Sequence, residues 1–216
     1  MNKQTGFTLI ELAIVLVIIG LLLGGVLRGQ ELINSAKVKN MARDFQNVQV
    51  YIYGYQDKFK ALPGDDPAAI THVGATTNGD RDGVIEGDWD TQVDGAESCN
   101  FWQHVRLAGL APGPTVVSCA PGNTYQPTNA DGGLIGIQSV SGFTDINVLP
   151  AVGGISGAYV VCSNAILGKF AKQLDTTLDD GVGNTGSVRI QVAGGAATNG
   201  VATPADATPH MVCMAI

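Results

Sequence analysis

The amino-acid sequence predicts an α+β protein in which one long N-terminal helix packs on a small β-rich globular head. Three observations carry this prediction. Near its N-terminus, after residues 1–6, the chain has an apolar run, Phe7–Leu27. Residues 30–59 then repeat apolar side chains at helical spacing, and no proline interrupts 7–59. From residue 61 onward, short apolar segments alternate with glycine and proline, as is typical of strands and turns.

Composition limits the class of protein. Apolar residues make up 45% of the 216 residues and charged residues only 14%, against roughly 25% charged in ordinary soluble domains. The chain has 12 basic and 19 acidic residues, for a net charge of −7, which disfavours a protein that coats nucleic acid. No nucleic-acid partner is therefore predicted. Charged and apolar residues are also unevenly distributed along the chain, with one long apolar run near the N-terminus.

Residues 7–27 predict a membrane-spanning helix. As an α-helix this run is long enough to cross the ~30 Å hydrocarbon layer, and Glu11 is its one charged residue. A secretory signal peptide has a shorter apolar core, of about 7–15 residues. A helix in the core of a soluble protein would show a polar face, and this one shows none. More basic residues follow the run than precede it, so charge alone would keep the rest of the chain in the cytoplasm.

The segment 6–11, Gly-Phe-Thr-Leu-Ile-Glu, resembles the type IV prepilin and type II secretion pseudopilin superfamily. The likeness consists of a short leader with a basic residue, a Gly-Phe junction and a carboxylate four residues beyond it. It implies that a prepilin peptidase cuts between Gly6 and Phe7 and methylates the new amine of Phe7. It also implies that the leader lies inside the cell and the chain beyond Leu27 outside. The head would then be periplasmic, and later part of a pilus, a pseudopilus or the cell surface.

The same resemblance implies the partners. These are identical subunits in a helical filament, other pilins or pseudopilins, the inner membrane and an assembly platform. Major subunits commonly carry a helix-breaking proline just after the membrane run, whereas this chain has Gly24, Gly25 and Arg28 there. Two functions therefore stay open: a structural filament subunit, or a minor tip subunit that acts as a membrane-anchored adhesin or binding module.

Glu11 is a candidate assembly residue on physical grounds alone. A carboxylate inside the bilayer costs a few kcal/mol and needs a partner. No other ionisable side chain lies between Lys3 and Arg28, so the partner is expected from elsewhere, and the free amine of Phe7 on a neighbouring subunit is the obvious cation. The resemblance implies the same pair, which would set the register of subunits entering a filament. A tolerated glutamate at the membrane edge is the alternative.

Residues 30–59 predict an amphipathic continuation of the helix. Its apolar residues recur at spacings of three and four and form one narrow stripe: Val38, Met41, Phe45, Val48, Ile52, Tyr55 and Phe59. Packing of this stripe on the chain's own head is favoured over a coiled-coil partner. The predicted domains are a leader at 1–6 that is removed, a helix at 7–60 that spans the membrane in 7–27, and a head at 61–216.

Six segments of the head show a secondary-structure pattern. The strand candidates are Leu134–Val140, Ala158–Cys162, Ser187–Ala193 and Met211–Ile216. Two short helices are expected, at Ser98–Leu110 and Ser163–Leu174, with Ser163 as the candidate N-cap of the second.

The loop between residues 61 and 100 is the main candidate for chemistry, because it holds nine carboxylates and one basic residue, Arg81. Residues 78–88 begin like a calcium-binding loop, with oxygen ligands at alternate positions and a glycine at the sharp turn. The candidate calcium ligands are Asn78, Asp80, Asp82, the Val84 carbonyl, Glu86 and Asp88.

The match to a calcium loop is partial, because Trp89 stands where the closing bidentate glutamate belongs. Asp88, Asp90, Glu86 or Glu97 would have to complete the shell. Some pilins and pseudopilins have similar acidic loops, which favours calcium over the alternative, a solvated loop without an ion. Magnesium fits less well because it tolerates irregular shells poorly.

The four cysteines, Cys99, Cys119, Cys162 and Cys213, allow three pairings. Outside the inner membrane their thiols should be oxidised. Proximity favours Cys99–Cys119, which leaves Cys162–Cys213 to staple the carboxyl end, as a C-terminal disulfide does in many pilins. Free buried thiols are the alternative.

The last two features are an acidic turn near residue 180 and the lack of a catalytic motif. The carboxylates of Asp175, Asp179 and Asp180 precede a glycine-rich turn, where a structural role before the Ser187–Ala193 strand is favoured over a second ion site. None of the three histidines stands beside a nucleophile motif, and no G-x-S-x-G sequence occurs. No enzyme activity is therefore predicted.

Overall fold

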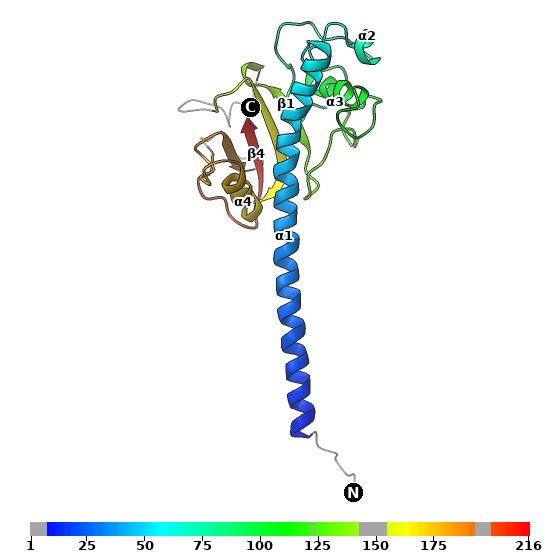
Figure 1. Cartoon of the computed structure of the whole chain (residues 1–216). Coiled ribbons are helices and arrows are strands. Elements are labelled where there is room, and N and C mark those ends of the chain that lie inside the picture. Colours follow the sequence, from blue (N-terminus) through cyan, green and yellow to red (C-terminus); the bar gives the residue numbers. More distant parts are fainter. Residues whose placement is uncertain (1–7, 123, 143–154, 193–199) are drawn as a thin grey trace. The chain divides into compact units, whose positions relative to one another are not determined.

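The computed structural model describes residues 8–122, 124–142, 155–192 and 200–216 (Figure 1). The chain divides into two compact units, Met1–Lys37 and Val38–Ile216. Its elements are α1 (Leu9–Phe59), α2 (Ala69–Val73), α3 (Glu97–Leu107), β1 (Ile135–Ser139), a 3-10 turn (Val140–Gly142), β2 (Tyr159–Leu167), α4 (Gly168–Leu178), β3 (Val188–Val192) and β4 (Pro209–Ala215). A long apolar N-terminal helix is followed by a small antiparallel sheet, so the predicted α+β, pilin-like class is confirmed.

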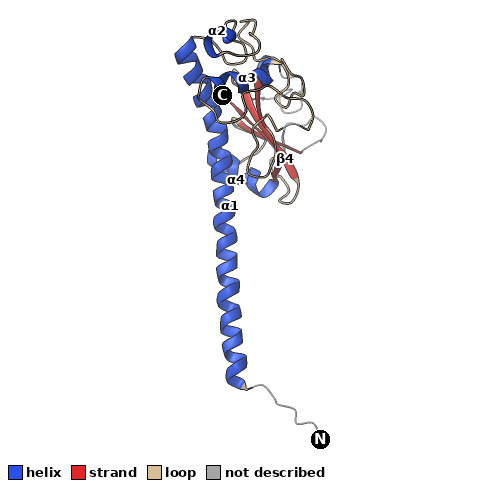
Figure 2. Ribbon diagram, turned by 90° about the vertical axis from the view of Figure 1, so that its right-hand side faces the viewer, coloured by secondary structure: helices blue, strands red, loops and turns tan. Residues whose placement is uncertain are grey.

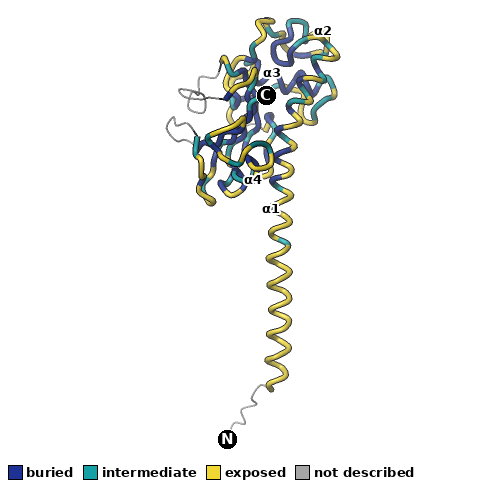
Figure 3. Tube along the Cα trace, turned by 60° about the vertical axis from the view of Figure 1, so that its left-hand side comes forward, coloured by how far each residue is buried: buried dark blue, intermediate teal, exposed yellow. Residues whose placement is uncertain are grey.

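The first unit contains the apolar part of α1. Every described residue from Thr8 to Arg28 is exposed, as Figure 3 shows in yellow. The exposed side chains include large apolar ones such as Leu9, Leu16 and Leu21, each at least 70% exposed. By length and composition α1 can cross a membrane. A helix that is apolar on all sides is stable in lipid or against other such helices, and not in water.

In the second unit the carboxyl-terminal half of α1 forms one wall of the core. Phe59 of the predicted stripe is half-buried. The other six residues of the stripe are buried: Val38, Met41, Phe45, Val48, Ile52 and Tyr55. Five of the six belong to the same apolar cluster as Ile137, Val161 and Ile190 of the strands. The stripe therefore packs on the chain's own head, as predicted. For the same reason the compact unit begins at Val38, well before the predicted boundary at residue 61.

The four strands form one antiparallel sheet in the order β1-β2-β4-β3. Figure 2 shows the strands of this sheet in red. Alternating residues of β2 point to its two faces. Val161 belongs to the cluster that includes the α1 stripe, whereas Val160 and Cys162 belong to a second cluster. Helix α4 packs on β2, β3 and β4, and α3 contacts β1.

Trp89 anchors the acidic loop to the second face of the sheet. It is 2% exposed and packs against Cys162 and Cys213. The loop passes so close to β1 that a Cβ on Gly136 would lie 1.8 Å from the Trp89 carbonyl oxygen. The Trp89 amide also donates to Oε1 of Gln138 at 2.7 Å. Trp89, which occupies the position of the closing glutamate in a calcium loop, is therefore a core residue.

The prediction of a helix over Ser163–Leu174 is wrong in its first five residues. Strand β2 continues to Leu167, and α4 begins at Gly168 with Leu167 as an N-cap that makes no side-chain hydrogen bond. The reason is tertiary: after a bulge at Ala165, where φ is 56°, β2 pairs again with β4 through Ile166 and His210. Pairing with β4 therefore keeps this segment in a strand, although its apolar spacing also suits a helix.

The other elements lie close to their predicted positions. Helix α3 begins one residue early and ends three residues early, and β4 begins at Pro209. Of the Ser187–Ala193 candidate, Val188–Val192 forms β3, and Ala193 lies outside the described residues. The five-residue helix α2 was not predicted.

Candidate functional site

At the start of α1, Glu11 forms a reciprocal pair with Thr8. Oε2 of Glu11 accepts hydrogen bonds from the Thr8 amide and hydroxyl, both at 2.7 Å, and the Glu11 amide donates to the Thr8 hydroxyl at 3.3 Å. This arrangement is a capping box, in which Thr and Glu three residues apart satisfy free amides at a helix start. The predicted partner of Glu11 is the Phe7 amine of a neighbouring subunit, and the T-x-x-E spacing signals this local partner in addition.

The capping box leaves the charge of Glu11 in place, because Thr8 supplies hydrogen bonds and no cation. Within the described residues no ion pair to Glu11 is present. Gly6 and Phe7, the candidate processing residues, lie outside the described residues. Cleavage between them and the pairing of Glu11 with the Phe7 amine therefore stay predictions.

The acidic loop closes around Asp65, which was not among the candidate ligands. Carboxylate oxygens of Asp65, Asp80 and Asp82 lie within 4.8 Å of one another, and we refer to these three residues as the Asp65 cluster. Asp65 is 3% exposed. Its carboxylate accepts hydrogen bonds from the Arg81 amide and, at 2.9 Å, from the Gly83 amide. Burial raises the pKa of Asp65, and the neighbouring carboxylates of the cluster add to this effect.

Glu97, the first residue of α3, borders the Asp65 cluster. It is 8% exposed, and its two carboxylate oxygens accept hydrogen bonds from the Asp80 amide at 3.4 Å and the Glu86 amide at 3.2 Å. Burial raises the pKa of Glu97 to about 7, with the Asp65 charge acting in the same direction. Buried carboxylates grouped in this way hold protons unless a cation compensates their charge.

The remaining candidate ligands make hydrogen bonds within and around the loop. Oδ1 of Asn78 accepts a hydrogen bond from the Ile70 amide in α2 at 2.9 Å. The Val84 amide donates to Oδ1 of Asp82 at 2.8 Å, closing a local turn. The Glu86 and Asp88 carbonyls accept hydrogen bonds from the Ser98 amide and hydroxyl, at 3.0 and 2.9 Å. Of the six candidates, only Asp80 and Asp82 contribute carboxylates to the cluster.

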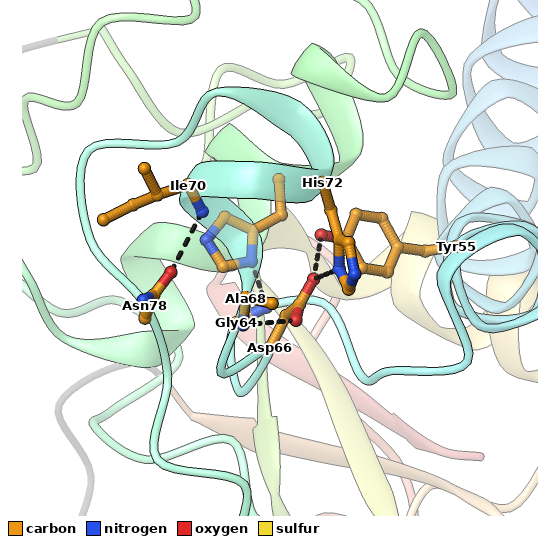
Figure 4. A network of polar contacts seen from close by, with 8 residues as sticks. Tyr55, Gly64, Asp66, Ala68, Ile70, His72 and Asn78 are labelled. Atoms are coloured by element: carbon orange, nitrogen blue, oxygen red, sulfur yellow. Dashed lines mark hydrogen bonds and ion pairs between the residues drawn. The ribbon is translucent and has the colours of Figure 1, made fainter.

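Asp66, beside Asp65, ties the end of α1 to the loop (Figure 4). It is fully buried, and its Oδ2 accepts hydrogen bonds from the Tyr55 hydroxyl and from Nδ1 of His72, both at 2.7 Å. Its Oδ1 accepts from the Ala68 amide at 2.9 Å. Burial alone would raise the pKa of Asp66, but these hydrogen bonds outweigh it and lower the pKa below its usual value. The charged network positions the backbone that carries Asp65.

His104 is expected to make the fold acid-sensitive. The Gly64 amide donates to Nδ1 of His104 at 2.9 Å, which requires the neutral ring with its proton on Nε2. Burial lowers the pKa of His104 from 6.5 to about 4, although the Asp66 charge opposes this. Between these values the unfolded chain binds a proton that the folded chain does not. The stability that His104 contributes is thus complete above pH 6.5 and is lost as pH falls toward 4.

Chemical denaturation of the full chain in detergent at pH 7 and pH 5 measures this effect. His104→Asn keeps an acceptor near the position of Nδ1 and removes the titration, while other acidic groups contribute equally to both proteins. On going to pH 5, the wild type should lose about 2 kcal/mol more unfolding free energy than the variant. Equal losses would contradict the assignment to His104.

Two disulfides close the head. Cys99 at the start of α3 is joined to Cys119, 20 residues later, and Cys162 of β2 to Cys213 directly opposite it in β4. These are the two pairs favoured in the sequence analysis. The second bond links the two central strands of the sheet, so it holds the C-terminal strand in place.

Comparison with known proteins adds one finding at the N-terminus. Residues 1–27 match the family model of the prokaryotic N-terminal methylation motif, which is the prepilin-type signature. No curated protein and no solved structure matches the chain. The motif indicates a precursor of the type IV pilin or pseudopilin kind. It implies processing by a prepilin peptidase and assembly with other pilins, and it is typical of structural proteins. Together with the apolar α1, it suits anchoring in a membrane.

Proposed function

We propose that this chain is a structural subunit of a type IV pilus or of a type II secretion pseudopilus. A prepilin peptidase removes residues 1–6, and the mature subunits polymerise through the apolar part of α1. The main support is that the methylation motif coincides with the exposed apolar part of α1. The methylation motif covers the same residues, up to 27, whose apolar side chains are exposed on all sides of the helix. Such a surface is stable first in the bilayer and then against the same helix of neighbouring subunits.

In this proposal the head lies on the periplasmic side of the inner membrane before assembly. Two disulfides support this, because they persist in oxidising compartments and are rare in the cytosol. The absence of free cysteines agrees with it, since every cysteine of the sequence is in one of these bonds.

A minor subunit at the filament tip is the second candidate function. It is favoured by α1 itself, which is one helix from Leu9 to Phe59 and lacks the proline common in major subunits. Immunogold labelling of intact filaments separates the two functions. Labelling along the whole filament is expected for a shaft subunit, and labelling confined to the ends supports the tip function. Filaments without any label would contradict both.

We also propose that the Asp65 cluster binds calcium, with Glu97 completing the site. Calcium bonds oxygen at about 2.3–2.6 Å, so two ligands of one ion are separated by at most ~5 Å. The oxygens of Asp65, Asp80 and Asp82, all within 4.8 Å of one another, meet this condition. A bound ion would also compensate the two buried carboxylates of this site, Asp65 and Glu97, whose negative charge burial disfavours.

Calcium should therefore stabilise the protein. At a hundredfold excess over the dissociation constant, binding adds ~2.7 kcal/mol, which corresponds to a rise in Tm of roughly 5–10 °C for a chain of this size. Asp80→Asn combined with Asp82→Asn should remove the part of this rise that comes from the Asp65 cluster. Glu86→Gln is the matched control, because it removes a carboxylate of the same loop outside the cluster. The measurement is Tm in calcium and in chelator, and an unchanged Tm of the wild type would exclude the site.

A further inference from the structure

A second group of carboxylates lies where α4 ends. Oxygens of Asp175, Asp179 and Asp180 are within 4.8 Å of one another. Asp175 is in the last turn of α4, and Asp179 is its C-cap. The carboxyl end of a helix carries partial negative charge and favours cations, yet the last turn of α4 contains no basic residue. Three negative charges thus gather at a place where the helix itself opposes them.

Asp175 distinguishes this group from an ordinary acidic turn. Its side chain is completely buried, and neither carboxylate oxygen accepts a hydrogen bond within the part of the chain that the structure describes. Buried carboxylates are almost always paired or hydrogen-bonded, because losing water is costly for a charge. Asp66 in the same protein shows the usual solution, with three donors around it. Among the described residues, Asp175 has no counterpart to the three donors that surround Asp66.

The two other carboxylates are held in place by the turn that leads to β3. Oδ2 of Asp179 accepts a hydrogen bond from the Val188 amide at 2.9 Å. The oxygens of Asp180 accept hydrogen bonds from the Val182 amide at 2.8 Å and the Thr185 hydroxyl at 2.6 Å. The group is therefore preorganised, with a buried carboxylate at its inner end and an exposed one, Asp180, at its outer end.

The charges around Asp175 do not cancel. Burial raises the pKa of Asp175 to about 6, and the charges of Asp180 and Asp179 act in the same direction. The nearby Gly181 amide and Arg189 of β3 oppose them, and Arg189 is the weakest of these influences. Its guanidinium also donates to the carbonyls of Gly186 and Val188. One guanidinium therefore faces three carboxylates.

We propose that Asp175, Asp179 and Asp180 bind a calcium ion at a site separate from the Asp65 cluster. An ion there supplies the missing partner of Asp175 and offsets the repulsion among the three carboxylates. The carboxylate oxygens all lie within 4.8 Å of one another, close enough to share one calcium ion, whose bonds are about 2.3–2.6 Å. Magnesium suits the group less well, because it demands near-octahedral geometry and gives up its water reluctantly. Water and backbone carbonyls complete the shell. The ion would fasten the end of α4 to the turn before β3.

The test is calcium titration calorimetry on the full chain in detergent, after treatment with chelator. The background protein carries Asp80→Asn and Asp82→Asn, so that the Asp65 cluster cannot contribute. It should still bind one calcium ion per chain, and magnesium at least tenfold more weakly. Adding Asp175→Asn should remove this binding. The matched control is Asp206→Asn, an exposed carboxylate that pairs with Lys172 of the same helix and should leave the binding unchanged.

Asp180→Asn is a second test, needed because Asp175→Asn changes a buried residue and could lose calcium binding through misfolding. Because Asp180 is exposed, this change should leave the Tm in chelator within one or two degrees of the background and weaken calcium at least tenfold. A background protein that binds no calcium would overturn the proposal while leaving the Asp65 site untouched. Calcium binding that survives both Asp175→Asn and Asp180→Asn would overturn it as well.

Discussion

Glu11→Gln is expected to abolish filaments while the subunit remains folded and inserted in the membrane. In an assembled bundle, the amine of Phe7 would lose its anionic partner. Removing one member of a buried ion pair costs ~3–5 kcal/mol per contact, which repeats at every subunit. Insertion should be unchanged or improved, because the substitution removes a charge from the bilayer. The measurement is the ratio of subunit in the sheared filament fraction to subunit in the membrane fraction.

Because Glu11 both carries a charge and caps the helix, two variants can separate these roles. Glutamine at the third helical position keeps the hydrogen bonds to Thr8, so Glu11→Gln changes the charge alone. Thr8→Val does the reverse: it removes the hydroxyl cap, at a cost of about 1 kcal/mol at the helix start, and keeps the carboxylate. Filaments should persist in Thr8→Val. Normal filaments of Glu11→Gln, or equal losses in both variants, would assign Glu11 to helix capping instead of assembly.

Gly6→Val should leave the leader attached to nearly all of the protein. The peptidase is expected to require a residue without a bulky side chain at the cut, and valine is branched next to the scissile bond. Without cleavage Phe7 has no free amine, so filaments should be absent even though Glu11 is intact. Mass spectrometry of the membrane fraction should show the unprocessed chain. Gln4→Ala, which changes the leader away from the cut, should mature normally. Maturation of Gly6→Val at the wild-type rate would contradict the proposed cleavage site.

Features that depend on local periodicity could be predicted from the sequence. The apolar run, the stripe from Val38 to Tyr55 and the strand that contains Val188 and Ile190 all follow from the spacing of apolar residues. The capping box of Thr8 and Glu11 was equally readable, because its two residues are three positions apart.

Features that depend on tertiary contacts could not be predicted in this way. Ile166 lies in a strand because β4 pairs with it, although its spacing from Phe170 and Leu174 also suits a helix. Asp65 joins the acidic cluster from 15 residues before Asp80, through hydrogen bonds to the Arg81 and Gly83 amides. No sequence spacing records such a contact. The lack of partners around Asp175 likewise becomes visible only once α4 has packed on the sheet.

Mass spectrometry of the N-terminal peptide from isolated filaments tests directly whether this chain is a processed filament subunit. The peptide is expected in the filament fraction, beginning at Phe7 and carrying one methyl group on its α-amine. Recovery of the chain only from membranes, with residues 1–6 still attached and no trace in filaments, would show that it is not a processed filament subunit.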